Sequence, residues 1–395
     1  MTITTLKPES AAQAVDAVRW ALSAGEPLEI LGSGSRRGLG RPVQAGHALD
    51  LSGLSGVIAY EPEELVLTAL AGTPMDTIRS MLAERGQHLA FEPPEGGTLG
   101  GLVASGLAGP RRISAGSARD HTLGIAGVSG RAEAYKGGGK VVKNVTGYDV
   151  PKLMAGSFGT LTALTEITVK VLPAPEDTAT LLLFGLDDAA AVAMLDRALR
   201  SPYEVSGAAH LPAGIAARSG VSAVSGAGGA VTLVRLEGFG PSVAARVAML
   251  REELRADAVL GRDLSLAVWR EVRDGACLGE GGDAHLWKLS VPPSAGPATV
   301  EAIRRTRDVE AFYDWGGGLV WVAMPFENEA DSSSIRRAVA EIGGHATLIR
   351  APAALRASID VFQPQEPALA ALSKRVKDSF DPKGVFNAGR MWAGV

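Results

Sequence analysis

The pattern of apolar and polar residues predicts short strands and glycine loops in the N-terminal part of the chain. Beyond about residue 177 it predicts longer strands that alternate with helices. In the first stretch, apolar positions at helical spacing predict an amphipathic helix over residues 10–24, capped by Ser10 and ended by Gly25. A second helix is predicted to begin near Pro74 and to stop before Gly86. Short apolar runs predict strands at residues 28–31, 49–54, 57–60, 65–70, 123–128, 132–135, 140–145 and 162–172.

Beyond residue 177 the pattern alternates between strands and helices. The predicted strands are 181–184, 231–236, 286–291 and 319–323, and the predicted helices are 187–200, 242–255, 297–305, 331–342 and 367–379. This order predicts an α+β domain with one antiparallel sheet and helices on one face. The small residues of 219–229 predict a mobile loop, and residues 173–177 look like a domain boundary.

Composition excludes several classes of function. With 46% hydrophobic and 21% charged residues, the 395-residue chain is typical of a globular protein, and its net charge of −4 argues against nucleic-acid binding. Cys277 is the single cysteine, so the chain holds no internal disulfide and no iron–sulfur or zinc–thiolate cluster, and we expect a reducing, cytoplasmic location. We see no signal-peptide pattern and no membrane-spanning run, so any membrane contact is expected to be peripheral, through a partner.

The first glycine loop, residues 32–40, directly follows a predicted strand. Glycines and serines in such a loop build a nest of backbone N–H groups that binds anions. The loop is not a P-loop, because no Gly-Lys-Ser/Thr follows, and it departs from G-x-G-x-x-G because Arg37 stands at the last glycine position. A turn with a purely structural role is the alternative.

The second glycine loop, residues 91–109, begins with two prolines that stiffen its entry. Within it, Leu99, Leu102, Val103 and Leu107 recur at helical spacing. They predict a short buried helix whose free N–H groups point at an anion, and the alternative is a mobile surface loop. The pair Arg111-Arg112 that follows is expected to be solvated, although it lies close enough in sequence to help hold phosphate.

Several short motifs, taken in order, resemble the FAD-binding PCMH-type, or vanillyl-alcohol-oxidase-like, flavoproteins. The resemblance runs from about residue 8 to residue 390, and within that superfamily it is greatest to the FAD-binding subunits of bacterial glycolate oxidases. The motifs are residues 32–35, 92–109, 116–120, 144–149, 156–161, 286–293, 314–318, 343–350 and 380–387.

The resemblance implies an α+β fold in three parts. Residues 1–175 would form a PCMH-type FAD-binding domain of two α+β subdomains, residues 176–355 an α+β cap domain with an antiparallel sheet, and residues 356–395 a C-terminal helix and tail that return to the flavin domain. The implied cofactor contacts are Gly32, Ser33, Gly34, Ser35, Gly38, Pro94, Gly97, Thr98, Gly100, Gly101, Ser105, Gly124, Gly159, Leu164 and Asn387. The first loop has neither His nor Cys, so we expect FAD to be bound non-covalently.

The resemblance also implies a subunit that supports oxidation of glycolate, a small 2-hydroxy acid, to glyoxylate. The expected partners are a catalytic FAD subunit and an iron–sulfur subunit that carries the electrons onward. Two other functions stay open: a self-sufficient FAD oxidoreductase that acts on another hydroxy acid, and a flavin-free scaffold subunit.

Candidate catalytic residues are few. The six histidines include no pair at metal-ligand spacing and no Glu-His-Gly motif, so no metal site is expected. His345 and Arg350 are the candidates for catalysis, and Lys288 and Arg350 could bind a carboxylate; structural or ion-pair roles are the alternatives. Cys277, Trp287, Trp315 and Trp321 are predicted to lie in the core or at an interface.

Overall fold

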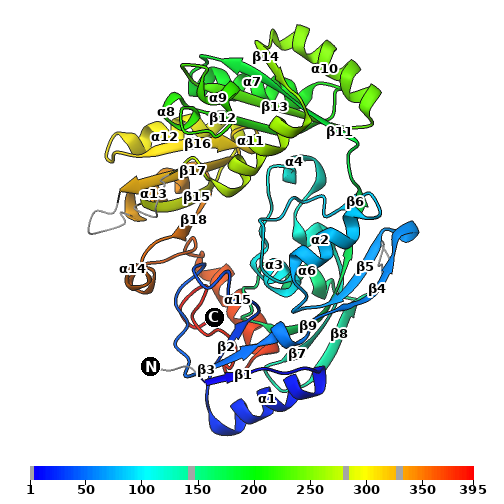
Figure 1. Cartoon of the computed structure of the whole chain (residues 1–395). Coiled ribbons are helices and arrows are strands. Elements are labelled where there is room, and N and C mark those ends of the chain that lie inside the picture. The colour runs from blue at the N-terminus through cyan, green and yellow to red at the C-terminus, as the bar shows by residue number, and fades with distance from the viewer. Residues whose placement is uncertain (1–3, 141–146, 279–283, 326–331) are drawn as a thin grey trace. The chain divides into compact units, whose positions relative to one another are not determined.

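The chain forms two compact units, which the computed structural model describes over residues 4–140, 147–278, 284–325 and 332–395 (Figure 1). Unit 1 comprises Met1–Ala108, Gly116–Pro173 and Arg356–Val395, and unit 2 comprises Gly109–Ala115 and Ala174–Leu355. The chain therefore enters unit 2 twice: once for the short segment Gly109–Ala115, and again for the long passage that begins at Ala174. The helix α14 (Ala353–Ser358) lies where the chain finally returns to unit 1.

Unit 1 contains a small parallel sheet and a larger antiparallel sheet. The parallel sheet has the order β1-β3-β2, and the antiparallel sheet has the order β4-β5-β9-β7-β8. A two-stranded pair, β6 with β10, completes the strands among the described residues. Their bounds are β1 Thr4–Leu6, β2 Leu28–Leu31, β3 His47–Asp50, β4 Val57–Glu61, β5 Val66–Leu70, β6 Gln87–His88, β7 Thr122–Ser129, β8 Ala134–Gly138, β9 Thr162–Lys170 and β10 Leu172–Pro173.

The predicted strand ends differ from the structure around β8. The strand predicted at residues 132–135 begins two residues later and extends further than expected, because Gly137 and Gly138 belong to β8. Glycine is needed here for packing: a Cβ on Gly124 of β7 would lie 2.6 Å from the carbonyl oxygen of Gly139. The predicted strand at 140–145 lies almost wholly outside the described residues.

The helices of unit 1 pack on these sheets through small and aliphatic residues. The first, α1, begins after Ser10, whose side chain accepts the N–H of Gln13, and ends at Gly25, which confirms the prediction. Pro74 precedes α2, as expected. The helices are α1 Ala11–Ala24, α2 Met75–Ala83, α3 Leu99–Ser105, α5 Ala118–His121, α6 Val150–Met154 and α15 Pro367–Phe380.

Unit 2 is built on one eight-stranded antiparallel sheet with the order β14-β11-β13-β12-β16-β17-β15-β18. The strands are β11 Asp177–Phe184, β12 Val205–Leu211, β13 Val231–Gly238, β14 Ala258–Leu260, β15 Ala284–Ser290, β16 Glu310–Asp314, β17 Leu319–Pro325 and β18 His345–Arg350. The helices are α4 Arg112–Ala115, α7 Asp188–Arg200, α8 Ala213–Ala216, α9 Ser222–Ser225, α10 Gly240–Leu254, α11 Arg262–Asp274, α12 Gly296–Arg304 and α13 Ser332–Ala340.

Helices cover both faces of this sheet, so the expectation of one covered face is wrong. Alternate residues of β11 show the reason. Leu181 packs in a core with residues of α7 and α10, whereas Leu182 packs in a second core with Trp269 of α11. Because successive residues of a strand point to opposite faces, a continuous apolar run such as 181–183 is buried on both sides.

Unit 2 contains helices where none was expected, namely α4, α8, α9 and α11. The helix α9 lies inside the predicted mobile loop 219–229, and α11 has no counterpart in the prediction. The signal for α11 was present in Val268, Trp269 and Val272, which lie at helical spacing among charged residues and are buried.

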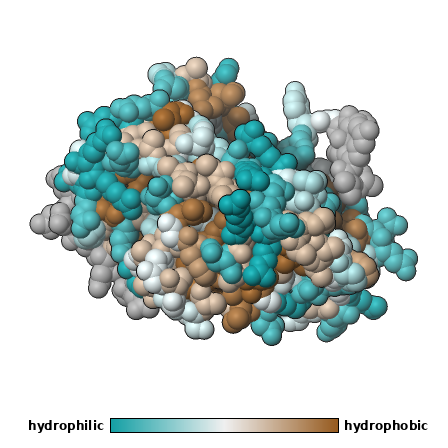
Figure 2. Space-filling view, turned by 90° about the horizontal axis from the view of Figure 1, so that it is seen from above, coloured by the Kyte–Doolittle hydropathy of each residue, from teal (hydrophilic) through white to brown (hydrophobic). Residues whose placement is uncertain are grey.

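The surface is of ordinary character. On the face drawn in Figure 2, hydrophilic and hydrophobic residues are interspersed. Among the described residues, no helix combines the length and the apolar character that crossing a membrane requires.

Candidate cofactor site

A hollow in unit 1 with about 700 Å³ of empty space brings the two glycine loops together. Its walls come from the loop after β2, from α3, from the turn before β9 and from the C-terminal tail. The predicted cofactor contacts that line it are Gly32, Ser33, Gly34, Ser35, Thr98, Gly100, Gly101, Ser105, Gly159, Leu164 and Asn387.

The first glycine loop presents open hydrogen-bond donors. Gly34 has a φ of 74°, which turns the chain sharply, and the N–H of Arg37 closes the turn on the carbonyl oxygen of Gly34 at 3.2 Å. Among the described residues, no group accepts a hydrogen bond from the backbone N–H groups of residues 33–36. Consecutive free N–H groups in a turn form an anion-binding nest, as the sequence predicted.

Arg36 adds a guanidinium group with unused donors to this loop. Its Nη1 donates to Ser35 Oγ at 3.2 Å, but its Nε and Nη2 are buried and have no acceptor in the part of the chain described. Burial, and then the positive charge of Arg79, lower the pKa of Arg36. Buried donors without an acceptor are costly unless a ligand accepts them, and phosphate oxygens match a guanidinium in geometry and charge. Sequence reasoning missed Arg36, because nothing distinguishes it from Arg37 in the sequence.

Arg37 has a structural role instead. Its guanidinium binds the buried carboxylate of Glu29 on β2 through two hydrogen bonds, one of them from Nε to Oε1 at 2.9 Å. This ion pair fixes the loop against the strand that precedes it.

Glycine is required where the two loops touch. A Cβ on Gly32 would lie 2.3 Å from Thr98 Oγ1, and a Cβ on Gly100 would lie 2.9 Å from both the Cβ and the carbonyl oxygen of Ala71. A larger residue at position 32 would push the two loops apart, and one at position 100 would push α3 away from Ala71, which follows β5.

The start of α3 differs from the expectation. The N–H groups of Leu99 and Gly100 donate to the carbonyl oxygens of Thr73 and Ala71 at 3.0 and 2.7 Å, and the N–H of Gly101 lies 3.2 Å from Thr98 Oγ1. These donors are therefore satisfied within the protein, and the expectation that they point at an anion is wrong. The cause is the pairing of Thr98 with Pro74, which places the loop against the start of α2.

The C-terminal tail forms part of the wall through Asn387. Its Oδ1 accepts the N–H of Ile30 at 2.8 Å and its Nδ2 donates to the carbonyl oxygen of Phe158 at 2.7 Å. Lys377 of α15 holds the tail by donating to Asp381 Oδ2 and to the carbonyl oxygen of Phe386 at 2.6 and 3.0 Å. Asn387 therefore connects two backbone segments beside the hollow.

Four predicted contacts do not line the hollow: Gly38, Pro94, Gly97 and Gly124. Pro94 accepts a hydrogen bond from Arg79 at 2.8 Å, and Gly124 approaches the backbone of Gly139 as described above. Gly97 supports the first loop, because a Cβ there would lie 2.9 Å from both Ser35 Oγ and Arg36 Nη1.

The two candidate catalytic residues lie at opposite ends of β18 in unit 2. Arg350 donates to the backbone carbonyl oxygens of Ala284 and Leu278 at 3.4 and 3.3 Å, which is a structural role. Partial burial and the positive charges of Lys288 and Arg112 lower the pKa of His345. The described residues contain no group of three or more His, Cys, Asp or Glu side chains arranged to hold a metal ion.

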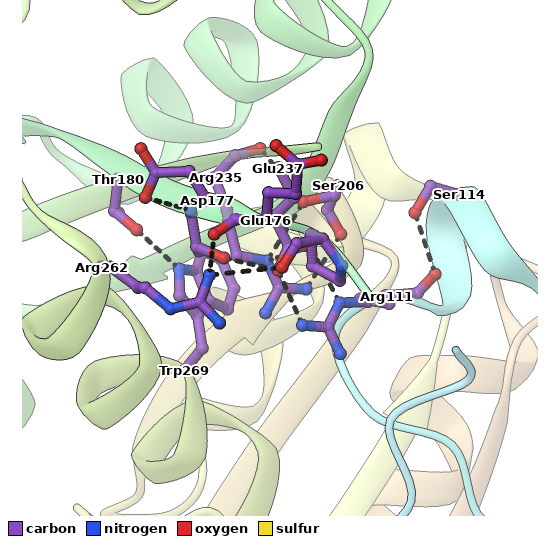
Figure 3. Close-up of polar contacts among 12 residues, drawn as sticks. Arg111, Ser114, Glu176, Asp177, Thr180, Ser206, Arg235, Glu237, Arg262 and Trp269 are labelled. Carbon is purple, nitrogen blue, oxygen red and sulfur yellow. Dashed lines mark hydrogen bonds and ion pairs between the residues drawn. The ribbon is translucent and has the colours of Figure 1, made fainter. Parts of the chain in front are cut away.

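Arg111 is not solvated, contrary to the expectation for the Arg111-Arg112 pair. Its Nε and Nη2 donate to the two carboxylate oxygens of Glu237 on β13 at 2.8 and 2.7 Å, and Arg235 lies 3.2 Å from the same carboxylate (Figure 3). Burial alone would raise the pKa of Glu237, but the two guanidinium groups more than reverse this and hold it well below its usual range. The segment Gly109–Ala115 is thereby anchored within unit 2.

Cys277, Trp287, Trp315 and Trp321 are buried, as predicted.

Comparisons with known proteins agree with this geometry. A family model described as an FAD binding domain matches residues 4–136. The glycolate oxidase subunit GlcE of Escherichia coli is 36% identical over 383 residues, which cover 96% of each chain. The glycolate oxidase subunit GlcD of Bacillus subtilis is 33% identical over 43% of this chain and 37% of its own. A solved structure of 4-ethylphenol oxidase from Gulosibacter chungangensis shares the fold, with a TM-score of 0.74, 17% identity and coverage of 98% of this chain and 89% of its own.

The fold and the anion nest define an FAD-binding flavoprotein of the PCMH type, which confirms the predicted fold class. The chain belongs to the family of FAD-dependent oxidoreductases that contains the glycolate oxidase subunit GlcE. FAD is its cofactor, and the residues present fit the diphosphate of that molecule, because the nest offers backbone N–H groups and Arg36 offers buried side-chain donors that no described residue accepts.

Proposed function

We propose that this chain is the FAD-holding subunit of a glycolate oxidase or dehydrogenase complex, in which it supports the oxidation of glycolate to glyoxylate. The observation that carries the proposal is the 36% identity with GlcE along 96% of both chains. We infer that a catalytic FAD subunit related to GlcD and an iron–sulfur subunit are its partners. The single cysteine supports the need for an iron–sulfur partner, because this chain cannot ligate a cluster alone.

The chain's own contribution is to bind and orient the cofactor. The N–H groups of residues 33–36 and the guanidinium of Arg36 would hold the diphosphate, and Gly32 and Thr98 would keep the two loops in contact around it. When bound, FAD supplies the capacity to accept two electrons as a hydride. The loop has neither His nor Cys to attach the flavin, so the proposal includes non-covalent binding, in the cytoplasm and at most at the periphery of the membrane through the complex.

An absorption spectrum of the purified full chain, before and after anaerobic addition of glycolate, tests the proposal. We expect flavin absorption that glycolate alone does not bleach. Bleaching by glycolate would assign the whole oxidation to this chain and overturn the subunit role. Flavin-free protein would favour the scaffold function.

A matched pair of glycine variants tests the binding loop. Gly34 and Gly25 both have positive φ values, 74° and 68°, so valine strains the backbone at either position. Gly34→Val is expected to lose most of the bound flavin, because it displaces the nest, whereas Gly25→Val at the end of α1 should retain it. Equal flavin content in the two variants would contradict the assignment of the loop.

A further inference from the structure

Unit 2 contains a cluster of positively charged side chains on one face of its sheet. Lys288 on β15 lies directly opposite Trp321 on β17 and Thr347 on the edge strand β18. His345 lies opposite Ser290, two residues further along β15. Directly opposed residues share a face, and so do residues two apart in a strand, so Lys288, Trp321 and His345 point to the same side.

Arg112 joins this cluster from the short segment Gly109–Ala115. The segment is held by the ion pair between Arg111 and Glu237 and by a hydrogen bond of 3.1 Å from Trp315 Nε1 to the carbonyl oxygen of Gly109. The guanidinium carbon of Arg112 lies 4.5 Å from the centre of the Trp315 ring, and Lys288 Nζ lies 4.8 Å from the same centre. Lys288 Nζ is also 5.8 Å from the centre of a Trp321 ring.

The cations of this cluster form no ion pair with any carboxylate in the described part of the chain. Among the described residues, no carboxylate lies within ion-pair distance of Lys288, Arg112 or His345, and none of the three side chains makes a hydrogen bond. Stacking on an indole ring uses the ring face and leaves the N–H donors available. The buried Nε1 of Trp321 also has no acceptor among the residues described. Asp314, whose charge acts on Lys288, already accepts the backbone N–H of Trp315 at 2.7 Å.

These groups also destabilise one another's charges. Burial and then Arg112 lower the pKa of Lys288 to about 8, and Asp314 opposes this shift only in part. Burial, Lys288 and Arg112 likewise lower the pKa of His345. A bound anion would relieve this repulsion and would accept the unused hydrogen bonds. The cluster therefore has the properties of an anion site rather than those of a structural ion-pair network.

We propose that unit 2 carries a binding site for a small carboxylate, in which Lys288 and Arg112 bind the carboxylate oxygens, His345 donates a further hydrogen bond, and Trp315 and Trp321 form the apolar wall. Both a carboxylate and a phosphate match the guanidinium fork, but a carboxylate fits this cluster better, because the indole rings of Trp315 and Trp321 accommodate the short carbon chain that it carries. The proposal of a carboxylate site does not depend on the proposed function. Only the choice of glycolate as the bound acid rests on that function.

Calorimetric titration of the full chain with glycolate, D-lactate and inorganic phosphate tests the site. We expect a carboxylate to bind, and Lys288→Met and Arg112→Gln to weaken that binding at least tenfold. Arg270→Gln is the matched control, because Arg270 is an exposed cation on α11 without an ion pair among the described residues, and its replacement should leave binding unchanged. Lys288→Arg keeps a cation in place and should retain most of the affinity.

The pH dependence gives a second readout. The carboxylate prefers the protonated amine, so affinity should fall as pH rises above about 8, approaching tenfold per pH unit, and this fall should vanish in Lys288→Met. Arg112 and Asp314 are the other charged groups that act on Lys288, and the positive charge of His345 should add affinity only in acid, below its lowered pKa.

The outcomes separate this site from the proposed function. Binding of glycolate that none of the variants weakens would overturn the site and leave the proposed function standing. Binding of D-lactate but not glycolate, with loss in both variants, would support the site and contradict the choice of acid. Binding of phosphate in preference to both acids, or no binding of any of the three, would overturn the site.

Discussion

Each unit contains a pair of adjacent arginines, and in each pair one arginine forms an ion pair with a buried glutamate while the other does not. In unit 1, Arg37 binds the buried carboxylate of Glu29, while the Nε and Nη2 of Arg36 have no acceptor among the described residues. In unit 2, Arg111 binds Glu237 through two hydrogen bonds, while Arg112 stacks on Trp315 and binds no carboxylate in the described part of the chain. In each pair one arginine fixes the backbone and its neighbour is left free for a ligand.

The ion pairs Arg37–Glu29 and Arg111–Glu237 differ in solvent exposure, and this difference determines how much each contributes to stability. The Arg37 side chain is 48% exposed, whereas that of Arg111 is 12% exposed and its partner Glu237 is 7% exposed. Water screens the first ion pair and hardly reaches the second, so the loss of a partner should be far more costly in unit 2. We propose that the neighbouring arginines, Arg36 and Arg112, serve different anions: the diphosphate of FAD in unit 1 and a small carboxylate in unit 2.

The largest effect is expected from Glu237→Gln. This change leaves Arg111 and Arg235 buried without their shared carboxylate, and breaking such a pair typically lowers the free energy of unfolding by about 3–5 kcal/mol. Urea denaturation measures it, with Glu310→Gln as the control, because the exposed Arg218–Glu310 pair contributes about 0–1 kcal/mol. If Glu237→Gln lost no more stability than Glu310→Gln, the burial of the Arg111–Glu237 ion pair would have no effect on the free energy of unfolding.

The acid stability of the wild type follows from the same carboxylate. The pKa of Glu237 is lowered in the folded chain, so its contribution to stability is fully present above the ordinary glutamate pKa of 4.5. It is lost progressively as the pH falls below that value toward the lowered pKa. The difference in stability between the wild type and Glu237→Gln should therefore shrink in acid.

Arg36→Gln should weaken FAD binding without changing the stability of the flavin-free chain. Hydrogen bonds from a charged group contribute about 1.5–3 kcal/mol, so the dissociation constant should rise roughly 10- to 100-fold. Arg37→Gln should show the opposite pattern, because it leaves Glu29 without its partner: we expect a loss of about 1 kcal/mol in stability of the flavin-free chain. Flavin titration measures the FAD affinity of both variants, and denaturation measures their stability. If the two variants lost affinity and stability to the same extent, Arg36 and Arg37 would not have different roles.

Periodicity and capping residues were enough to predict much of the fold. The ends of α1 follow from Ser10 and Gly25, and a run of aliphatic residues marks β11, because these are local signals. The coverage of the unit 2 sheet on both faces could not be predicted, because the partners of Leu181 and Leu182 lie far away in sequence, on α7, α10 and α11.

The site was predictable only where it depends on backbone conformation. Loop 32–40 was predicted as an anion nest from its glycines and serines, and the N–H groups of residues 33–36 have no acceptor among the described residues. The N–H groups at the start of α3 looked similar in sequence, yet Thr73 and Ala71 accept them. Likewise, nothing local distinguishes Arg36 from Arg37 or Arg111 from Arg112, because the distinction is made by the glutamates Glu29 and Glu237 elsewhere in the chain.

Lys288→Met is expected to stabilise the chain, by about 1 kcal/mol after allowance for the partial exposure of the side chain. The lowered pKa of Lys288 means that the folded state binds this proton less tightly than the unfolded state does. The charged Lys288 therefore destabilises the wild type fully below about pH 8, and this destabilisation shrinks as the pH rises toward 10.5. Thermal denaturation at pH 7 and pH 9 measures it. A variant that is less stable than the wild type would indicate a structural lysine.

The smallest effect is expected from Arg112→Gln, and it is the sharpest test of the comparison. Arg112 is exposed and stacks on Trp315 without an ion pair among the described residues, so its loss should change the free energy of unfolding by no more than about 0.5 kcal/mol. Arg111→Gln, one residue earlier, should cost about 1–3 kcal/mol, because it leaves the buried Glu237 with fewer hydrogen bonds. If denaturation gave equal losses for the two neighbours, both arginines would be structural, and the cluster around Lys288 would have lost the free cation that makes it an anion site.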